Sequence, residues 1–368
     1  MNVLHINGNY LFTALHQNMI RAMNNFDVKN DVFVPMYNKN TAVVSPDSNV
    51  TISECFKKTD RFLFGCKQKK ILSAVKNNYD IKKFDCIHAY TVFTDGNVAY
   101  NLYKEYGIPY VVAVRNTDIN TFFKYMVHLR KRGIEILKNA SAVFFLSPVY
   151  KKRLFDKYIN DADAEIIEPK CYIMPNGIDD FWLKNLYNNK DFSKDNDVIK
   201  VACVGSIDNN KNMLSVAKAL DLLKEQGKKV SLNIAGKIKD QNIYNLLIKY
   251  DFVKYMGVLP TEKLIEVYRA NDVFALTSFK ESFGMVYIEA MSQGLPVIYT
   301  KGEGFDGQFE DGNVGYSVSP SDTTDISEKI CMAYNNKETI YKSVIEKVQN
   351  FSWNEIVDEY IRIYSNIL

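Results

Sequence analysis

DVFALTSFKESFGMVYIEAMSQGLPVIYT, residues 272–300, predicts four successive elements of structure. An apolar strand over 273–277 leads into a polar loop over 278–282, and a helix begins near Gly284. The helix ends at Gly294, and a second short apolar strand follows Pro296. Similar alternation of apolar strands and amphipathic helices runs along the whole chain, which predicts an α/β protein with parallel sheets covered by helices.

The junction between the loop and the helix is predicted to bind an anion. A helix N-terminus leaves about four backbone N–H groups without partners and carries about half a positive charge. The donors here are the amides of Ser282, Phe283, Gly284 and Met285. Glu281 precedes the helix and Glu289 lies about one turn inside it. Two carboxylate acceptors beside an anion-binding helix end suit a molecule with hydroxyls at both ends and phosphate between them, such as a nucleotide sugar.

The same residues resemble a known signature. Glu281, seven residues, Glu289, and then Gly-Leu-Pro-Val-Ile at 294–298 resemble the pattern of the family 4 retaining glycosyltransferases, which have the GT-B fold. The resemblance implies that Glu281 contacts the donor sugar at the reacting centre and that Glu289 binds the ribose hydroxyls. The alternative is that both carboxylates are solvated charges around a surface helix, and the Gly-Leu-Pro-Val-Ile segment weighs against it. Residues 172–179, YIMPNGID, also resemble the family's I-P-N-G-V-D element at the end of the first domain.

Composition sets the class of protein. The 368 residues suffice for two domains, and the chain is 47% hydrophobic and 24% charged, with a net charge of +3 that is too mild to indicate a nucleic acid partner. No signal peptide and no apolar run near the ~20 residues of a membrane span are visible. The six cysteines form no C-x-x-C pair, so neither a disulfide framework nor a zinc site is indicated. We therefore expect a cytoplasmic protein.

In the first half of the chain, the ends of three predicted strands carry candidate acceptor-side residues. Gly8 lies between a strand over 2–6 and a helix over 15–23, at the position where the family often has a Gly pair close to donor phosphate and acceptor, although an ordinary turn is the alternative. The strand over 86–90 contains His88, at the position of the family's D-x-I-H element. The resemblance places Gly8 and His88 on the acceptor side, and the alternative for His88 is a satisfied core residue.

The strand over 110–114 ends in Arg115-Asn-Thr-Asp118, which resembles the family's H-G-T-D element. Arg115 stands where many members have His, and it stays protonated, so it cannot act as an acid or base but could clamp a phosphate. Asp118 is expected either to accept from an acceptor hydroxyl or to cap a helix that starts near Asn120. Both residues are assigned to the acceptor side.

Two basic, aromatic-rich segments, 62–72 and 122–132, permit two interpretations. In related enzymes a positive amphipathic helix of the first domain meets an anionic membrane that carries a lipid-linked acceptor. The alternative is a solvated helix face over the sheet.

The second half opens with a strand over 199–204, a loop from Gly205, and a helix led by Lys211. In the family an Arg directly after the Gly and a Lys five residues further on hold the donor diphosphate. Lys211 fits the Lys position, but Ser206 occupies the Arg position. The diphosphate charge must then be met by Lys211, by the helix end at 283–285, and by Lys237 or Arg115.

Further elements complete the donor side. A strand over 231–235 ends at Gly236-Lys237, and the stretch with Val258 at 257–260 resembles the backbone that contacts the nucleobase in relatives. Residues 311–316 resemble the family's D-G-x-x-G turn, and the last helix, around 353–364, resembles the segment that crosses back onto the first domain.

The predicted architecture is GT-B, with two Rossmann-like parallel-sheet domains that face each other across a cleft. The N-terminal acceptor domain covers 1–185, a polar linker covers 186–197, and the nucleotide-sugar domain covers 198–350. The C-terminal helix, 351–368, is expected to pack on the first domain.

The predicted activity is metal-independent transfer of a hexose-type sugar with retention, without a cofactor, from a UDP-sugar or alternatively a GDP-sugar. Glu281 and Lys211 are the expected catalytic residues. The D-x-D pairs at 161–163 and 195–197 lie in polar segments and are interpreted as solvated charge rather than a metal site. A glycan or lipid-linked acceptor of bacterial surface-polysaccharide synthesis, reached at the inner face of the membrane, follows from the resemblance. The alternatives are a nucleotide-sugar epimerase, a glycan phosphorylase, or a non-catalytic sugar-nucleotide-binding subunit, which Ser206 and Arg115 would favour.

Overall fold

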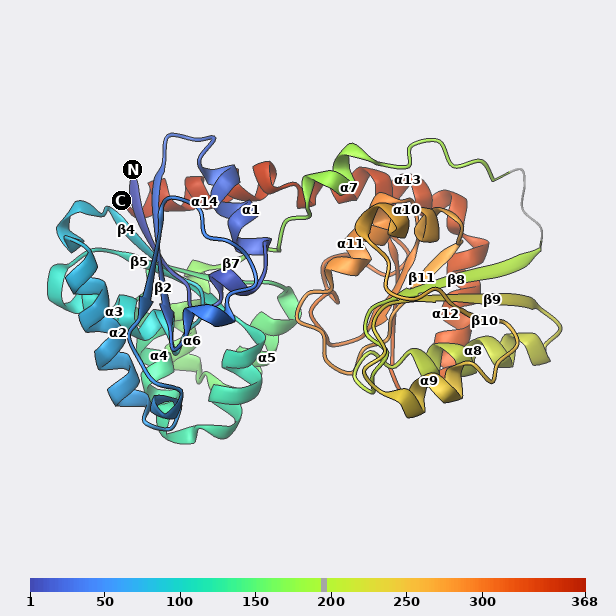
Figure 1. The fold of residues 1–368 in the computed structure, drawn as a ribbon, viewed down its shortest axis with the longest axis horizontal. Helices are drawn as coiled ribbons and strands as arrows, with labels where there is room; N and C mark the ends of the chain where they lie inside the picture. The colour runs from blue at the N-terminus through green and yellow to red at the C-terminus, as the bar shows by residue number, and fades with distance from the viewer. Residues whose placement is uncertain (193–196) are drawn as a thin grey trace. The chain divides into compact units, whose positions relative to one another are not determined.

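The computed structural model describes residues 1–192 and 197–368, and it divides the chain into two compact units. Unit 1 comprises Met1–Gly177 and Trp353–Leu368, and unit 2 comprises Ile178–Ser352. Each unit is one parallel sheet with helices on both faces (Figure 1). Asp195, from the second D-x-D pair, lies outside the described residues.

Unit 1 contains a seven-stranded parallel sheet in the order β3-β2-β1-β4-β5-β6-β7. Its strands are β1 (Asn2–Ile6), β2 (Lys29–Met36), β3 (Val50–Glu54), β4 (Cys86–Ala89), β5 (Tyr110–Val114), β6 (Ala142–Phe145) and β7 (Cys171–Ile173). Its helices are α1 (Leu15–Met23), α2 (Phe64–Asn78), α3 (Asp95–Tyr106), α4 (Arg130–Asn139), α5 (Pro148–Tyr158), α6 (Asp161–Ile167) and α14 (Trp353–Ile367). The helix predicted at the C-terminus, α14, packs beside α1 in this unit.

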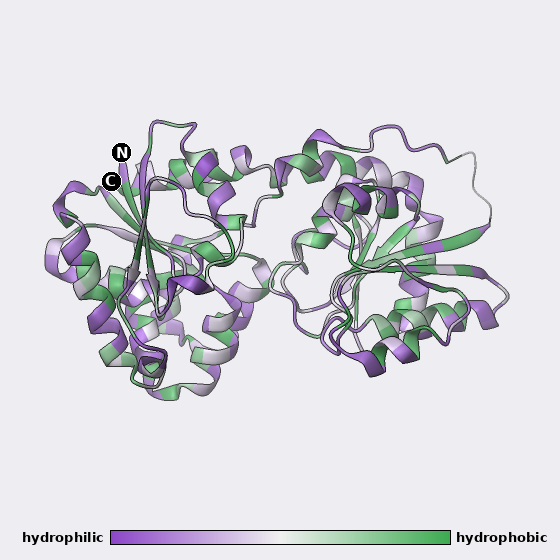
Figure 2. Ribbon diagram, in the orientation of Figure 1, coloured by the Kyte–Doolittle hydropathy of each residue, from purple (hydrophilic) through white to green (hydrophobic). Residues whose placement is uncertain are grey.

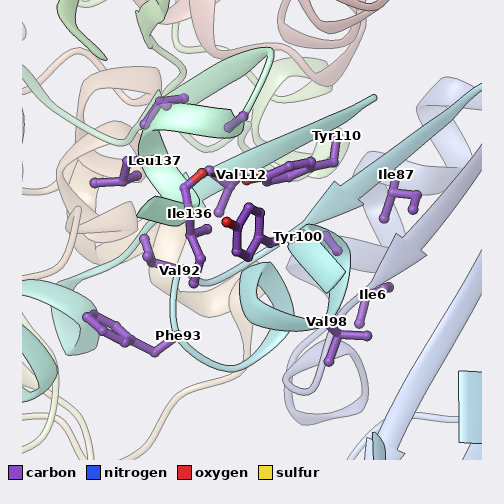
Figure 3. Close-up of a cluster of buried hydrophobic side chains, with 14 of the residues drawn as sticks. Ile6, Ile87, Val92, Phe93, Val98, Tyr100, Tyr110, Val112, Ile136 and Leu137 are labelled. Atoms are coloured by element: carbon purple, nitrogen blue, oxygen red, sulfur yellow. Dashed lines mark hydrogen bonds between the residues drawn. The ribbon is translucent and has the colours of Figure 1, made fainter. Parts of the chain in front are cut away.

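Successive side chains of a strand point to opposite faces of the sheet, and in unit 1 helices cover both faces, so both are buried. On β1, Leu4 and Ile6 join a core with α2, α3 and α4, whereas Val3 joins the core beneath α1 and α14. Figure 3 shows part of the first core, where Tyr100, Tyr110 and Ile136 pack together. Such two-sided burial explains why the strands are continuous apolar runs in the sequence.

Unit 2 contains a six-stranded parallel sheet in the order β10-β9-β8-β11-β12-β13. Its strands are β8 (Val198–Val204), β9 (Lys229–Ala235), β10 (Val253–Tyr255), β11 (Val273–Ala275), β12 (Val297–Thr300) and β13 (Gly315–Val318). Its helices are α7 (Asp180–Lys184), α8 (Met213–Glu225), α9 (Gln241–Leu247), α10 (Thr261–Arg269), α11 (Met285–Ser292), α12 (Thr323–Asn335) and α13 (Lys337–Lys347). In this unit α8 and α9 lie on one side of the sheet, and α10, α11 and α13 lie on the other (Figure 1). The strand–loop–helix–strand prediction for 272–300 corresponds to β11, α11 and β12.

Two local predictions were wrong. The segment 122–132 is not one amphipathic helix, because a π-helical turn over Asp118–Phe123 and a 3-10 turn over Val127–Leu129 precede α4. The Arg130 side chain donates to the carbonyls of Phe123 and Lys124, which ends the first turn. Asp118 does not cap that turn either, since it accepts from the amides of Arg115 and Phe93 instead.

The strands of both sheets are mostly hydrophobic, and the helices are mixed (Figure 2). Among the described residues, no helix combines the length and the apolar character needed to cross a bilayer.

Candidate functional site

The carboxyl ends of the strands of unit 2 bring the predicted donor-side loops to one edge of the sheet. The loops that follow β8 and β9 touch there: the amide of Gly205 donates to the Ala235 carbonyl at 2.9 Å, and the amide of Ile207 donates to the Lys237 carbonyl at 2.9 Å. A Cβ on Gly236, which has a φ of +143°, would lie 1.8 Å from the Gly205 carbonyl oxygen. Gly236 is therefore required for the two loops to approach each other.

Lys211 and Glu281 meet at this edge although 70 residues separate them in the sequence. Lys211 Nζ donates to Glu281 Oε2 at 2.6 Å, with the two side chains 23% and 13% exposed. Glu281 Oε1 also accepts from the Ser282 amide at 3.1 Å. The structure thus brings together the two residues that the sequence assigns to catalysis.

The loop that carries Lys211 is ordered by Asp208. Its carboxylate accepts from the Ser206 hydroxyl at 2.6 Å and from the Lys211 amide at 2.9 Å, and it lies 3.8 Å from Lys239 Nζ. Partial burial works against ionisation of Asp208, but these hydrogen bonds and the Lys239 charge hold its pKa below the usual value. Ser206, which replaces the family's Arg, is therefore bound to an internal acceptor.

The loop that carries Glu281 is held from two sides. The Asn210 side chain donates to the Lys280 carbonyl at 3.0 Å and accepts from the Lys280 amide at 3.1 Å. From the segment after β12, the buried Glu303 carboxylate accepts from the Glu281 amide at 2.9 Å, and the Gly304 amide donates to the Glu281 carbonyl at 3.0 Å. These bonds fix the backbone on both sides of the Lys211–Glu281 pair.

Helix α11 begins directly after this loop. Gly284 precedes its first residue with a φ of +83°, and a Cβ there would lie 2.3 Å from the Tyr287 ring. Phe283 is buried against Phe305 and Phe351, so it offers its backbone rather than its side chain. Within the described part of the chain, the amides of Gly284 and Met285 have no hydrogen-bond acceptor. They are available for an anion, as predicted for a helix start.

Glu289 lies one turn inside α11 and is partly buried. Its Oε2 accepts from the Tyr268 hydroxyl at 3.1 Å. Burial raises the pKa of Glu289 to about 7, the Tyr268 hydrogen bond opposes that rise, and the negative charge of Asp179 adds to it.

The two remaining donor-side predictions are exposed at the same edge. Lys237 follows β9 with an exposed side chain, and the Val258 side chain, after β10, is 70% exposed. The loops that carry them are joined by the Gly236 amide, which donates to the Gly257 carbonyl at 2.8 Å.

The four acceptor-side predictions lie in unit 1, where the structure encloses most of their polar atoms. The Gly8 amide donates to Asp95 Oδ1 at 3.4 Å, and the Asp95 carboxylate also accepts from the Thr91 hydroxyl at 3.1 Å. Asp95 is 2% exposed, and burial raises its pKa to about 7 against the effect of these hydrogen bonds.

His88 is fully buried rather than open at the sheet edge. Its Nδ1 bonds to the Tyr364 hydroxyl of α14 at 2.6 Å, and its ring stacks on Tyr90 with 4.3 Å between centroids. Tyr90 in turn bonds to His5, and burial lowers the pKa of His5 to about 4 and of His16, beside Tyr90, to about 3. These contacts support the core interpretation of His88.

Arg115 and Asp118 belong to one turn after β5. The Arg115 amide donates to Asp118 Oδ2 at 2.9 Å, and Arg115 Nε donates to the Tyr90 carbonyl at 3.2 Å. Asp118 is 1% exposed, and burial raises its pKa to about 6 although several amides bond to it. Arg115 is partly exposed, so it is the one of these two whose side chain reaches solvent.

Sequence reasoning missed several residues that order the site in unit 2. They are Asp208, Asn210, Tyr268 and Glu303. Asp208 and Asn210 could have been suspected because they lie in the loop between Gly205 and Lys211. Nothing in the local sequence marks Tyr268 or Glu303, since each reaches its partner across the fold.

Asp163, from the first D-x-D pair, forms an ion pair with Lys138 at 2.9 Å.

Comparisons with known proteins find a match for most of unit 2. Residues 187–351 match the sequence profile of the family Glycosyl transferases group 1. A D-inositol 3-phosphate glycosyltransferase of Corynebacterium efficiens is 29% identical over 116 residues, which are 31% of this chain and 27% of that protein. The alignment thus spans about a quarter of that curated relative.

Solved structures with a similar fold cover the whole length of this chain. Sucrose-phosphate synthase from Thermosynechococcus elongatus has a TM-score of 0.76 at 20% identity and covers 100% of this chain and 99% of its own. Anabaena HepE in complex with UDP and glucose has a TM-score of 0.68 at 18% identity and covers 100% of both chains. At these identities the likeness shows the fold, and it confirms the predicted fold class. The chain therefore has the GT-B fold, and its residues 187–351 match the profile of the group 1 glycosyltransferases.

Proposed function

We propose that the protein is a retaining glycosyltransferase that moves a hexose-type sugar from a nucleotide diphosphate sugar to a glycan or lipid-linked acceptor. The observation that carries the proposal is the Lys211–Glu281 pair, at 2.6 Å, directly before the start of α11. A fixed cation and unpaired backbone amides meet there at one edge of the sheet. They form an anion site, and Glu289 supplies a hydroxyl acceptor one turn further along α11.

The diphosphate of the donor is bound by Lys211, by the amides of Gly284 and Met285, and by Lys237 at the edge. The residues that line the site are Gly205, Ser206, Val258, Ser282 and Phe283. As the bond between the sugar and the diphosphate breaks, these donors stabilise the charge that develops on the leaving phosphate. The acceptor hydroxyl attacks from the same face, which gives retention without a metal ion.

Glu281 is proposed to contact the donor sugar at the reacting centre. Its ion pair with Lys211 and the bonds to its backbone fix its position. Preorganised groups of this kind lower the barrier because they need not reorient during the reaction. Glu289 is proposed to accept from the ribose hydroxyls.

A UDP-sugar is the proposed donor, and a GDP-sugar is the alternative. The likeness to Anabaena HepE, solved with UDP and glucose, supports UDP. Arg115 is proposed to bind an anionic group of the acceptor, since it is a partly exposed cation at the end of β5. Gly8, His88 and Asp118 would shape the acceptor side through the backbone and core contacts described above.

The acceptor is proposed to be a glycan or lipid-linked saccharide of bacterial surface-polysaccharide synthesis, met by a cytoplasmic protein at the inner face of the membrane. The surface around α2 supports a membrane contact. Leu63, Tyr125 and Val127 are 60%, 68% and 60% exposed there, and Lys67 and His128 line an apolar pocket of about 430 Å³ beside them. Basic and apolar groups together suit an anionic bilayer surface.

The test is a transfer assay with the purified full-length protein. UDP-glucose and GDP-mannose are offered with bacterial lipid-linked and soluble glycan acceptors, and the product's anomeric configuration is determined by NMR. Transfer with retention that is lost in Lys211→Ala supports the proposal. Inversion, a requirement for a divalent metal, or full activity of Lys211→Ala would contradict it, and donor binding without transfer would point to a non-catalytic subunit.

A further inference from the structure

Tyr268, on α10, is a buried phenol to which the proposed reaction assigns no part. It is 0% exposed, and its ring packs edge-on against Trp182 and Phe274, at 5.6 and 5.8 Å between ring centroids. Because the ring is enclosed, its hydroxyl has a fixed position. That hydroxyl donates to Glu289 Oε2 at 3.1 Å.

We propose that Tyr268 is a positioning residue for nucleotide-sugar binding: its hydroxyl holds the Glu289 carboxylate in the orientation and the ionised form that accept the two hydroxyls of a ribose. The inference rests on the proposed function, which gives Glu289 its ribose. Tyr268 itself need not touch the ligand. A carboxylate with one oxygen fixed by a phenol keeps its remaining lone pairs directed to one side.

The charges around Glu289 make this hydrogen bond important. Glu289 is the one charged residue of α11, and no cation among the described residues pairs with it. Asp179, before α7, is an anion that disfavours its ionisation. Tyr268 is thus the contact that opposes both burial and Asp179.

The basic groups on the neighbouring helices are engaged elsewhere. On α10, Arg269 donates to the Gln293 side chain at 2.8 Å and to the Asn185 carbonyl at 2.7 Å. On α7, Lys184 pairs with Asp180 at 3.8 Å. On α13, Lys337 pairs with Asp272 at 3.1 Å. Glu289 therefore has the Tyr268 hydroxyl as its stabilising partner.

The consequence is a dependence of binding on pH. Burial, opposed by Tyr268, leaves the pKa of Glu289 at about 7. Above that pH Glu289 is ionised and accepts from the ribose, and below it the protonated form accepts less well, so affinity falls on acidification. Removing the Tyr268 hydroxyl takes away a stabiliser of the anion, so the pKa of Glu289 rises and the loss of affinity begins about one pH unit higher.

The experiment measures UDP-glucose affinity by calorimetry between pH 5.5 and 9.5 on the full chain. UDP-glucose is chosen because its esterified diphosphate does not titrate in this range, and GDP-mannose is the second probe. We expect the wild type to lose about tenfold in affinity around pH 7. Tyr268→Phe should show the same transition about one unit higher. The matched control is Tyr299→Phe, which removes another buried phenol that bonds to a carboxylate, Asp311 at 3.4 Å.

A 2′,3′-dideoxyribose analogue of UDP-glucose identifies the group that Glu289 contacts, and its affinity should not change with pH. If the affinity of Tyr268→Phe changes at the same pH as that of the wild type, the inference is overturned. This holds even if the variant binds more weakly at every pH, because a purely structural role of Tyr268 would leave the pH midpoint unchanged. Failure of both nucleotide sugars to bind the wild type at every pH would instead overturn the proposed function.

Discussion

The two sheets share a strand order, but the polar residues at their carboxyl edges differ in burial. In unit 1, His5, His88 and Asp95 are at most 2% exposed, and each is hydrogen-bonded to another group inside the protein. In unit 2, Lys211 and Glu281 remain 23% and 13% exposed, beside helix amides that lack an acceptor among the described residues. The same topology thus carries an enclosed polar core in one unit and partly exposed polar groups in the other.

The difference matters because buried polar groups chiefly affect folding, whereas partly exposed groups at a strand edge are available to ligands. Substitutions at the edge of unit 1 should therefore change stability and its pH dependence. Substitutions at the edge of unit 2 should change binding and turnover while the fold remains intact. Four experiments test this division.

The largest effect is expected for Lys211→Ala. Lys211 is the fixed cation of the proposed leaving-group site, so turnover should fall about 1000-fold, which corresponds to about 4 kcal/mol. Steady-state kinetics with UDP-glucose measure it, and thermal unfolding should stay close to the wild type. Lys218→Ala, an exposed lysine on α8, is the control and should keep full activity. Equal losses in both variants would contradict the assignment of Lys211.

Asp95→Asn should stabilise unit 1 by about 3 kcal/mol at pH 8. Burial raises the pKa of Asp95 to about 7 from 3.8, so the folded state favours the protonated acid. Ionised Asp95 therefore destabilises the folded state. This destabilisation is complete above pH 7, decreases as the pH falls, and is absent near pH 4. Urea unfolding followed by hydrogen exchange of β1 and β4 should show the gain at pH 8 and none at pH 4. A gain that is equal at both values would mean that the charge of Asp95 is not its cause.

Glu281→Gln should lower turnover about 100-fold, or about 2.7 kcal/mol, while the affinity for UDP changes little. The amide keeps the shape of the side chain but removes the negative charge that pairs with the Lys211 ammonium and that is proposed to contact the donor sugar. Comparing turnover with UDP affinity separates the two effects. Wild-type turnover in this variant would remove Glu281 from the reacting centre.

The smallest effect is expected for Lys237→Ala. Lys237 is an exposed cation after β9, so its attraction for a diphosphate is screened by salt. UDP-glucose binding should weaken about threefold at 50 mM salt and be almost unchanged at 500 mM. Lys229→Ala, at the opposite end of the same strand, is the matched control. A similar loss in both variants would indicate a general field rather than a site.

The sequence predicted much of the fold because its signals are local. β1, α1 and β5 begin and end where the apolar runs and their flanking residues place them. Ser147 caps α5 by accepting from the Tyr150 amide, as Ser-Pro before a helix indicates. The failure at 122–132 arises from hydrogen bonds that periodicity does not show, since Arg130 donates to the Phe123 carbonyl and the buried Asp118 accepts from the distant Phe93 amide.

The sequence by itself determined the alternation of strands and helices, the helix start at Gly284, and the pair of carboxylates that flanks it, because spacing and residue type along the chain specify these features. Only the tertiary structure decided that Lys211 meets Glu281, that Tyr268 holds Glu289, and that His88 is enclosed by Tyr90 and Tyr364. Apart from the stacking of His88 on Tyr90, those contacts join residues 21 to 276 positions apart in the chain. Local periodicity carries no information about them, since partners this far apart are brought together by the packing of helices on the sheets.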